Sequence, residues 1–344
     1  MRAEKIYPLL CKPVLKEKIW GGRKLETLFQ LSLPEEKKIG EAWMVADLEE
    51  GASTILNGFL AGKELSSAVE AWGFRNMIGK AWSDHYTGKR YPLLIKFLDA
   101  QDNLSVQVHP DHRACQTEFP DENSKDESWI IVQADPGGTI LHGFKPGTNL
   151  ARFDELLEEN KVTECLREVE VDAGQVYRVA PGTVHALCEG VAILEIQEPS
   201  DSTFRIYDYG RTDDAGNPRE LHLDQARKVM HFASEAPPEV QPRSKSEKWG
   251  MHDLLVDVPA YRIERLRIHG EPLRWKVNPR STQSLIVLDG LLELHGGRER
   301  IALSAGQVVV LPAAVGTIEL QPQSANATCI LAGAGGGKMV DDEK

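Results

Sequence analysis

The sequence predicts a mainly β protein in two related halves, with strands arranged as a sandwich or barrel and a few peripheral helices. Short runs of β-branched and aliphatic residues recur between Gly, Pro and Asp turns, as in residues 91–98, 128–133 and 191–197. Regularly spaced strands of this kind are typical of a sandwich or barrel. A chain of 344 residues is also long enough for two packed units.

A weak internal repeat indicates that the two units are related. Residues 173–187 (AGQVYRVAPGTVHAL) parallel residues 305–320 (AGQVVVLPAAVGTIEL), with a slip of one residue after the first strand. Each copy combines a Gly turn, a strand, a Pro turn and a second strand, which predicts a β-hairpin. The first copy carries His185 and the second contains no histidine, so we expect the second unit to be a degenerate structural copy.

Three segments have helical character: residues 64–73, 149–160 and 221–232. Apolar residues recur at helical spacing in the second of them, and Asn149 or its neighbour is a suitable N-cap.

A Pro-rich polar stretch, residues 236–243, follows the third helical segment and predicts a domain boundary. The expected division is a metal-binding catalytic domain with helical insertions over residues 1–235 and a degenerate β domain over residues 236–335. A flexible tail is expected over residues 336–344, after a run of glycines.

Composition excludes several classes of partner. The formal net charge of −12 argues against nucleic acid, because phosphate backbones require clustered Lys and Arg. It leaves room for a small anionic substrate held by a few local cations. No apolar run is long enough to span a bilayer, and the first residues lack the apolar run of a signal peptide.

The cysteines predict the compartment. The five cysteines are scattered, odd in number and form no CxxC motif, which is typical of reduced thiols in a cytoplasm. We expect a cytoplasmic monomer, because no segment has the character of a dimerisation element.

One constellation of polar residues on predicted strands indicates a metal site. Residues 105–110 (SVQVHP) alternate, which places Ser105, Gln107 and His109 on one face of a strand. Residues 125–129 (KDESW) begin another strand, with Lys125 and Glu127 on one face.

After a longer excursion, residues 181–185 (PGTVH) add His185 at a strand start. Two imidazoles, a carboxylate and an amide oxygen suit Zn²⁺, with Mn²⁺, Fe²⁺ or Co²⁺ as alternatives. Either histidine alone is more often a satisfied polar residue, at odds of about four to one or more, so only the combination supports a metal site.

These motifs resemble those of the type I mannose-6-phosphate isomerases, zinc-dependent members of the cupin superfamily. The resemblance rests on residues 104–111 (LSVQVHPD), 125–129 and 181–186 (PGTVHA) and extends over about residues 10–230 in order. Further matching segments are residues 13–22, 39–43, 93–100, 194–211 and 219–223. The chain length is similar to that of the short bacterial form of the family.

The resemblance implies two cupin-type (jelly-roll) β-barrel domains, the second of them degenerate. It implies one Zn²⁺ and no organic cofactor, with a small hexose phosphate as the partner. The family's metal ligands fall on Gln107, His109, Glu127 and His185, with Gln107 close to the metal in short members whether or not it binds.

Its catalytic residues match Glu195 and Arg205, ten positions apart. Ser105 and Lys125 match positions that line the substrate pocket, and we assign Lys125 to the catalytic groups.

The implied reaction interconverts mannose 6-phosphate and fructose 6-phosphate through an enediol. It needs a base, a proton shuttle between oxygens and a cation that stabilises the enediolate. Glu195 lies among aliphatic residues on a predicted strand, where desolvation raises the pKa of a carboxyl group toward neutrality. The alternatives for Glu195 are an ion pair with Arg205 or an outward position on an edge strand.

Three further assignments keep a structural alternative. Arg205 and Arg211 can hold a phosphate by charge-assisted bonds, or either can pair with a nearby aspartate. Trp20 is expected to shape the sugar pocket, with a core position equally compatible. Residues 44–47 (MVAD) and Ser128 depart from the family pattern and affect pocket shape rather than the metal ligands.

Two other functions remain open at this level. One is a cupin isomerase or epimerase for another sugar or sugar phosphate, and the other is a non-catalytic, metal-containing sugar-binding cupin. Glu195 beside Arg205 argues against the second, because binding alone needs no base. A cupin dioxygenase fits less well, since such sites usually present more histidine ligands.

Overall fold

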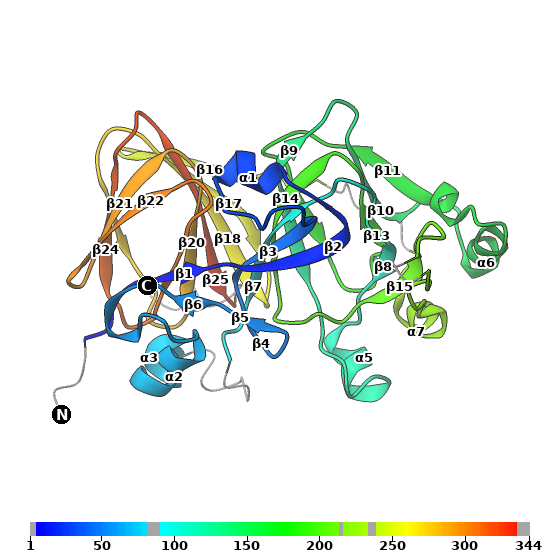
Figure 1. The fold of residues 1–344 in the computed structure, drawn as a ribbon, viewed down its shortest axis with the longest axis horizontal. Helices are drawn as coiled ribbons and strands as arrows, with labels where there is room; N and C mark the ends of the chain where they lie inside the picture. Colours follow the sequence, from blue (N-terminus) through cyan, green and yellow to red (C-terminus); the bar gives the residue numbers. More distant parts are fainter. Residues whose placement is uncertain (1–4, 81–89, 213–215, 233–238, 336–344) are drawn as a thin grey trace.

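The computed structural model describes residues 5–80, 90–212, 216–232 and 239–335. Its strands form two double-sheet units that lie side by side, one coloured mainly blue to green and one coloured mainly yellow to red (Figure 1). This arrangement confirms the predicted mainly β architecture of two jelly-roll units with a few peripheral helices.

The first unit consists of two facing antiparallel sheets. Its six-stranded sheet contains, in spatial order, β12 (Val176–Val179), β9 (Glu127–Ala134), β14 (Val191–Gln197), β7 (Leu94–Asp99), β3 (Ile39–Val45) and β2 (Val14–Gly22). Its five-stranded sheet contains β11 (Leu166–Glu170), β10 (Thr139–Phe144), β13 (His185–Leu187), β8 (Val106–Val108) and β15 (Phe204–Tyr207). The predicted strand at residues 191–197 is β14 itself.

The second unit has the same design. Its larger sheet contains β16 (Arg243–Glu247), β17 (Gly250–Asp257), β18 (Tyr261–Ile268), β25 (Ala327–Ala334), β20 (Gln283–Asp289), β23 (Val308–Leu311), β1 (Leu9–Lys12) and β6 (Thr54–Ile55). Its smaller sheet contains β19 (Leu273–Lys276), β24 (Thr317–Pro322), β21 (Leu291–Gly296) and β22 (Glu299–Ser304). A separate two-stranded ribbon pairs β4 (Asp47–Leu48) with β5 (Gly51–Ala52).

The internal repeat is visible in the order of the strands. Strands β2, β3 and β7 to β14 correspond, in chain order and in sheet position, to strands β16 to β25. The repeated Gly turns also match in detail, since the side-chain oxygens of Gln175 and Gln307 accept bonds from the backbone N–H groups of Asp172 and Ser304 at 2.7 and 2.8 Å.

The prediction that each repeat forms a hairpin was wrong. β12 and β13 lie in different sheets of the first unit, and β23 and β24 lie in different sheets of the second. The intervening turn therefore carries the chain from one sheet to the facing sheet, which sequence periodicity cannot distinguish from a turn within one sheet.

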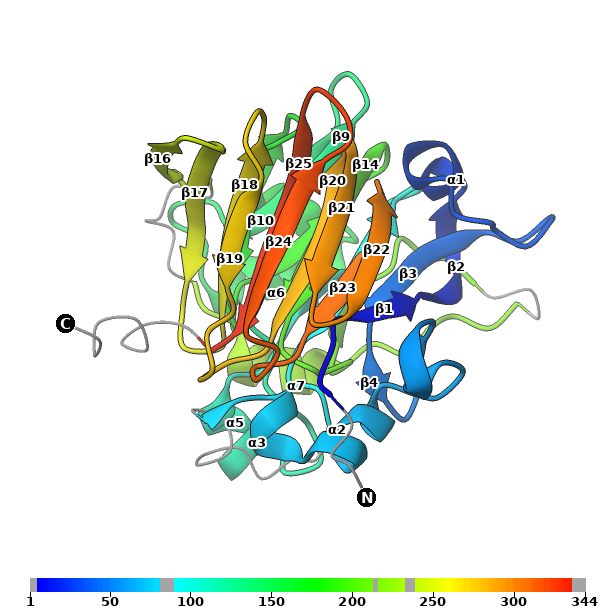
Figure 2. The same cartoon turned by 90° about the vertical axis from the view of Figure 1, so that its left-hand side faces the viewer.

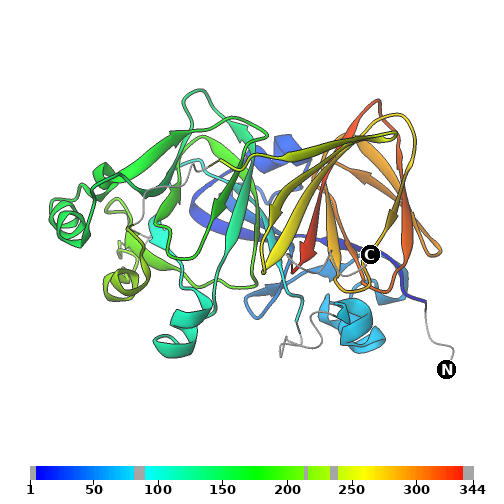
Figure 3. The same ribbon diagram turned by 180° about the vertical axis from the view of Figure 1, so that it is seen from behind.

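Two N-terminal strands join the larger sheet of the second unit. β1 pairs with β23, and β6 pairs with the other edge of β1. Figure 3 shows this blue segment running between the two units. One apolar core cluster contains buried residues of both units, among them Phe97, Ile130, Val308 and Ile330. The predicted boundary at residues 235/236 and the predicted tail at 336–344 lie outside the described residues, and the domain division stays a prediction.

The helices are short and peripheral. Those in the described residues are α1 (Lys24–Phe29), η1 (Gly58–Leu60), α2 (Ser66–Trp72), α3 (Phe74–Met77), α5 (His112–Thr117), α6 (Leu150–Glu158), η2 (Val162–Cys165) and α7 (Leu223–Val229). The three predicted helical segments correspond to α2, α6 and α7. The side chain of Asn149 caps α6 by accepting a bond from the N–H of Arg152 at 3.0 Å.

Figure 2 shows α2 and α3 close together near the N-terminal end of the described chain. The five cysteines are free thiols, four of them buried. Within the described residues, no helix has both the length and the apolar character needed to cross a membrane.

Candidate metal centre and active-site pocket

Three of the four predicted metal ligands meet between the two sheets of the first unit. His109 follows β8, Glu127 begins β9 and His185 begins β13. All three are buried, and one ligand atom from each lies within 4.8 Å of the others. The Nε2 atoms of His109 and His185 lie 3.4 and 3.3 Å from the two carboxylate oxygens of Glu127.

The hydrogen bonds of this triad fit a divalent metal. Nδ1 of His109 lies 2.8 Å from the carbonyl oxygen of Ser202, and Nδ1 of His185 lies 2.8 Å from that of Thr183. These bonds place the proton on Nδ1 and leave the Nε2 lone pair for a ligand, as outer partners of metal-bound histidines do.

Several of the facing atoms have no hydrogen-bond partner. They are Nε2 of His109 and both carboxylate oxygens of Glu127, of which Oε2 has an ion pair with Lys125 at 3.0 Å. Buried polar atoms without a partner are costly, at about 1–3 kcal/mol each. A bound cation would satisfy all three atoms together.

Electrostatics keep the triad in its metal-binding protonation state. Burial lowers the pKa of His185 to about 3. Burial and the nearby Lys125 lower the pKa of His109. Burial acting alone raises the pKa of Glu127, but Lys125 and His109 outweigh burial and hold that pKa well below 4.5. At neutral pH the site therefore presents two neutral imidazoles and one carboxylate.

Gln107 and Lys125 lie beside the triad. Gln107 is the register partner of His185, and its amide nitrogen lies 3.2 Å from Nε2 of that histidine. The ammonium group of Lys125 lies 3.0 Å from Oε2 of Glu127. The structure thus brings Gln107 next to the predicted ligands, where a rotated amide would present its oxygen.

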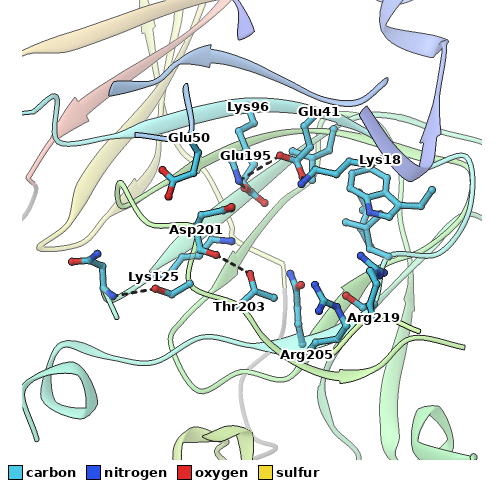
Figure 4. Close-up of a pocket in the computed structure, with 18 of the residues that line it drawn as sticks. Lys18, Glu41, Glu50, Lys96, Lys125, Glu195, Asp201, Thr203, Arg205 and Arg219 are labelled. Atoms are coloured by element: carbon cyan, nitrogen blue, oxygen red, sulfur yellow. Dashed lines mark hydrogen bonds and ion pairs between the residues drawn. The ribbon is translucent and has the colours of Figure 1, made fainter. Parts of the chain in front are cut away.

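A cavity of about 490 Å³ opens next to this centre. Such a volume is within the range of about 300–1,000 Å³ that is typical of small-molecule sites. Its lining includes the predicted residues Trp20, Ser105, Gln107, Lys125, Glu195 and Arg205. Figure 4 shows charged side chains from several strands around this cavity.

Glu195 lies on β14 inside the pocket and is 3% exposed. Its Oε2 accepts a bond from the indole N–H of Trp129 at 3.1 Å, while its Oε1 has no hydrogen-bond partner. Burial and the charge of Glu127 raise the pKa of Glu195, although Lys96 and Lys125 oppose them. A desolvated carboxylate with one oxygen that accepts no hydrogen bond, although it faces Lys96, has the properties of a general base.

Sequence reasoning missed a group of charges on the wall of the pocket. The ammonium group of Lys96 lies 3.3 Å from Oε1 of Glu195 and 3.9 Å from Oε2 of Glu41. Lys18 lies 3.0 Å from Oε1 of Glu41. Burial would raise the pKa of Glu41, but Lys96, Lys18 and the bond from Trp43 lower it to about 2. The available signal was a single lysine in the aliphatic run of residues 93–98.

Three arginines near the pocket, Arg205, Arg211 and Arg219, differ in whether they line it. Arg205 and Arg219 line the cavity, and the Nε of Arg205 has no hydrogen-bond partner. Burial and the neighbouring Arg219 lower the pKa of Arg205. Arg211 lies outside the lining and pairs with Asp208 at 2.6 Å and Asp102 at 3.3 Å. Arg211 therefore pairs with nearby aspartates, which is the alternative that the sequence left open for it. Arg219 binds the same Asp208 at 2.7 Å but also lines the cavity.

The second unit has no corresponding site among its described residues. The repeat and the strand registers show which residues of the second unit correspond to the site. Trp275 stands for Gln107, Val277 for His109, Gln283 for Glu127, Ile318 for His185 and Leu331 for Glu195. The indole N–H of Trp275 donates to Oε1 of Gln283 at 3.0 Å. This hydrogen bond joins the residues that stand at the positions of Gln107 and Glu127. The expectation that this unit is a degenerate copy stays a prediction.

Comparison with known proteins identifies the family. A family model described as the catalytic domain of type I phosphomannose isomerases matches residues 8–144. The probable mannose-6-phosphate isomerase GmuF of Bacillus subtilis is 32% identical over 331 residues, covering 92% of this chain and 96% of the relative. A mannose-6-phosphate isomerase of Streptococcus mutans is 32% identical over 305 residues, covering 89% of this chain and 92% of the relative.

The fold leads to the same family. The crystal structure of the mannose 6-phosphate isomerase from Bacillus subtilis superposes with a TM-score of 0.85 at 29% identity, covering 95% of this chain and 99% of that structure. Sequence, strand order and structural likeness therefore agree, and this chain belongs to the type I mannose-6-phosphate isomerase family of the cupin superfamily.

Proposed function

We propose that this protein interconverts mannose 6-phosphate and fructose 6-phosphate, with one Zn²⁺ held by His109, Glu127 and His185 and with Gln107 beside them. The observation that carries this proposal is a buried carboxylate, Glu195, in the lining of a cavity that opens beside a triad of potential ligands whose unsatisfied atoms face one another. Relatives that are aligned over most of this chain are named as isomerases of this substrate.

The reaction moves one proton between two neighbouring carbons. Glu195 would remove the proton from C2 of the aldose while the carbonyl oxygen O1 gains a proton, which gives the enediol. It would then return its proton to C1 while O2 loses its hydroxyl proton and becomes the carbonyl oxygen of the ketose. The metal supplies a positive charge that stabilises the oxygen atoms of the enediol(ate). Oε1 of Glu195, which accepts no hydrogen bond and faces the ammonium group of Lys96 at 3.3 Å, would take the proton, while the bond from Trp129 orients the carboxylate.

The cations of the pocket would bind the rest of the substrate. Lys125 is buried at the triad and would donate to a substrate oxygen, and Ser105 adds a hydroxyl group to the same lining. Arg205 and Arg219 carry guanidinium groups toward the cavity, where charge-assisted bonds would hold the phosphate. Trp20 would pack against the sugar. The free thiols support a reducing compartment, and we place the enzyme in the cytoplasm.

The test is a coupled assay for fructose 6-phosphate formed from mannose 6-phosphate. It is run on metal-stripped protein, after addition of Zn²⁺, and on a Glu195→Gln variant. We expect activity that depends on Zn²⁺ and that falls by about 10²–10⁴-fold in the variant, with one zinc still bound per chain. A protein that binds zinc but converts no mannose 6-phosphate would refute the substrate assignment.

A further inference from the structure

We propose that Tyr261, a residue of the second unit, is a positioning residue for the metal centre of the first unit. It would act through Asp126, which stands between Lys125 and Glu127 in the chain. This inference rests on the proposed function, because it concerns the same centre. It assigns a role in catalysis to the unit that has lost its own ligand positions.

The contact crosses from one unit to the other. Tyr261 begins β18 in the larger sheet of the second unit and is fully buried. Its hydroxyl group donates to Oδ1 of Asp126 at 2.6 Å and lies 3.0 Å from the hydroxyl of Ser128. Arg178, on β12 of the first unit, binds both oxygens of the same carboxylate.

Strand alternation connects this contact to the metal centre. Neighbouring side chains on an extended strand point to opposite faces. Asp126 and Ser128 therefore face the second unit, while Lys125 and Glu127 face the cavity and the triad. A shift of Asp126 along or across the strand would displace both of these cavity-facing residues.

Hydrogen bonds also hold the backbone of Asp126. Its N–H donates to Oε2 of Glu198 at 3.0 Å, and its carbonyl accepts from the N–H of Glu198 at 3.1 Å. Glu198 belongs to the first unit, as does Arg178. Tyr261 thus provides a contact by which the second unit takes part in fixing the start of β9.

Outer partners of this kind matter because they orient metal ligands. Loss of an outer-shell partner typically costs about 10–100-fold in metal affinity or activity. Tyr261 stands one residue further out than a direct partner of Glu127, so we expect an effect near the lower end, about tenfold.

The experiment compares Tyr261→Phe with a matched control, Tyr91→Phe. Tyr91 is also fully buried, and its hydroxyl also reaches the second unit, where it lies 2.8 Å from the hydroxyl of Ser284. Three measurements are made: the Zn²⁺ dissociation constant by chelator competition, the visible spectrum of the Co²⁺-substituted protein, and the steady-state kinetics with mannose 6-phosphate, which give kcat and KM.

We expect Tyr261→Phe to weaken Zn²⁺ binding and to lower kcat about tenfold each, and to change the Co²⁺ spectrum. Tyr91→Phe should leave all three unchanged even if it lowers the melting temperature. In an Asp126→Asn background, Tyr261→Phe should have no further effect on Zn²⁺ affinity, because both changes act on one path.

A Tyr261→Phe variant with wild-type Zn²⁺ affinity and Co²⁺ spectrum would show a purely structural contact and overturn the inference. If that variant does not fold, Asp126→Asn alone decides: wild-type Zn²⁺ affinity and Co²⁺ spectrum would equally overturn it. Failure of the proposed function is recognised separately, because it would appear in the wild-type protein as zinc binding without isomerase activity.

Discussion

Lys96 and Glu195 are register partners on the adjacent strands β7 and β14, and the ammonium nitrogen of Lys96 lies 3.3 Å from Oε1 of Glu195. Both side chains are almost completely buried. The pair places a positive charge on the carboxyl group that we propose as the catalytic base. Because Glu41 binds the same lysine at 3.9 Å, the charge of Lys96 is shared between two carboxylates.

Removing that charge should move the pH dependence of the reaction. The pKa of Glu195 is raised above 4.5 by burial and Glu127, and Lys96 opposes this rise. In Lys96→Met the pKa of Glu195 rises further, so a higher pH is needed to form the active carboxylate. We expect the acidic limb of the kcat/KM profile to shift to higher pH when measured between about pH 5 and 9.

The control for this experiment is Lys18→Met. Lys18 lines the same pocket but pairs with Glu41 at 3.0 Å rather than with Glu195. Its loss should shift the acidic limb less than the loss of Lys96. Identical limbs in wild type and Lys96→Met would contradict an assignment of that limb to Glu195.

Loss of a metal ligand should separate metal binding from folding. In His185→Asn we expect zinc retention and isomerase activity to be lost, because Nε2 is one of the atoms facing the centre. The folded state should lose only about 1 kcal/mol, the contribution of the bond from Nδ1 to Thr183. Zinc content per chain and thermal unfolding of the metal-free proteins measure the two effects.

His252→Asn is the comparison, since this histidine belongs to the second unit and binds Glu264 at 2.9 Å. It should retain one zinc per chain and full activity. Retention of zinc by His185→Asn at the wild-type level would exclude this residue as a ligand.

The arginines near the pocket should differ in their kinetic effects. Arg219→Met should raise KM for mannose 6-phosphate about 10–100-fold, since a charge-assisted bond contributes about 1.5–3 kcal/mol. Arg211→Met should lower the melting temperature with little effect on KM, because both arginines bind Asp208 but only Arg219 lines the cavity. Steady-state kinetics and thermal unfolding of both variants give the comparison. The reverse pattern would assign the phosphate to Arg211, as sequence reasoning allowed.

The two copies of the repeat offer a matched test of packing. Gly174 and Gly306 both have positive φ, +92° and +81°, so Ala at either position should cost about 1–2 kcal/mol of conformational strain. A Cβ at Gly306 would also lie 2.4 Å from Cβ of Phe29, whereas at Gly174 its nearest neighbour is the end of Arg265 at 3.9 Å. Denaturant unfolding should therefore show a larger loss of stability for Gly306→Ala. Equal losses would mean that Phe29 moves aside without cost.

Much of the site was predictable from short stretches of sequence. Alternation along a strand is a local property, so residues 105–110 by themselves place Gln107 and His109 on one face. The same applies to Lys125 with Glu127, which the structure finds 3.0 Å apart. Glu195 was recognisable because an ionised group in an aliphatic strand requires either a partner or a function.

What the sequence alone determined, then, was local: the strands, the capped helix at Asn149, the repeat and the residues of the candidate metal triad. Pairings between distant strands depended on the tertiary structure, because register and sheet assignment arise from the packing of the whole chain. That packing brought Lys96 to Glu195, put Arg219 rather than Arg211 at the cavity, and joined Tyr261 to Asp126 across the two units. It also placed β1 in the sheet of the second unit. There β1 pairs with β23, and its buried residues join the core cluster that contains residues of both units.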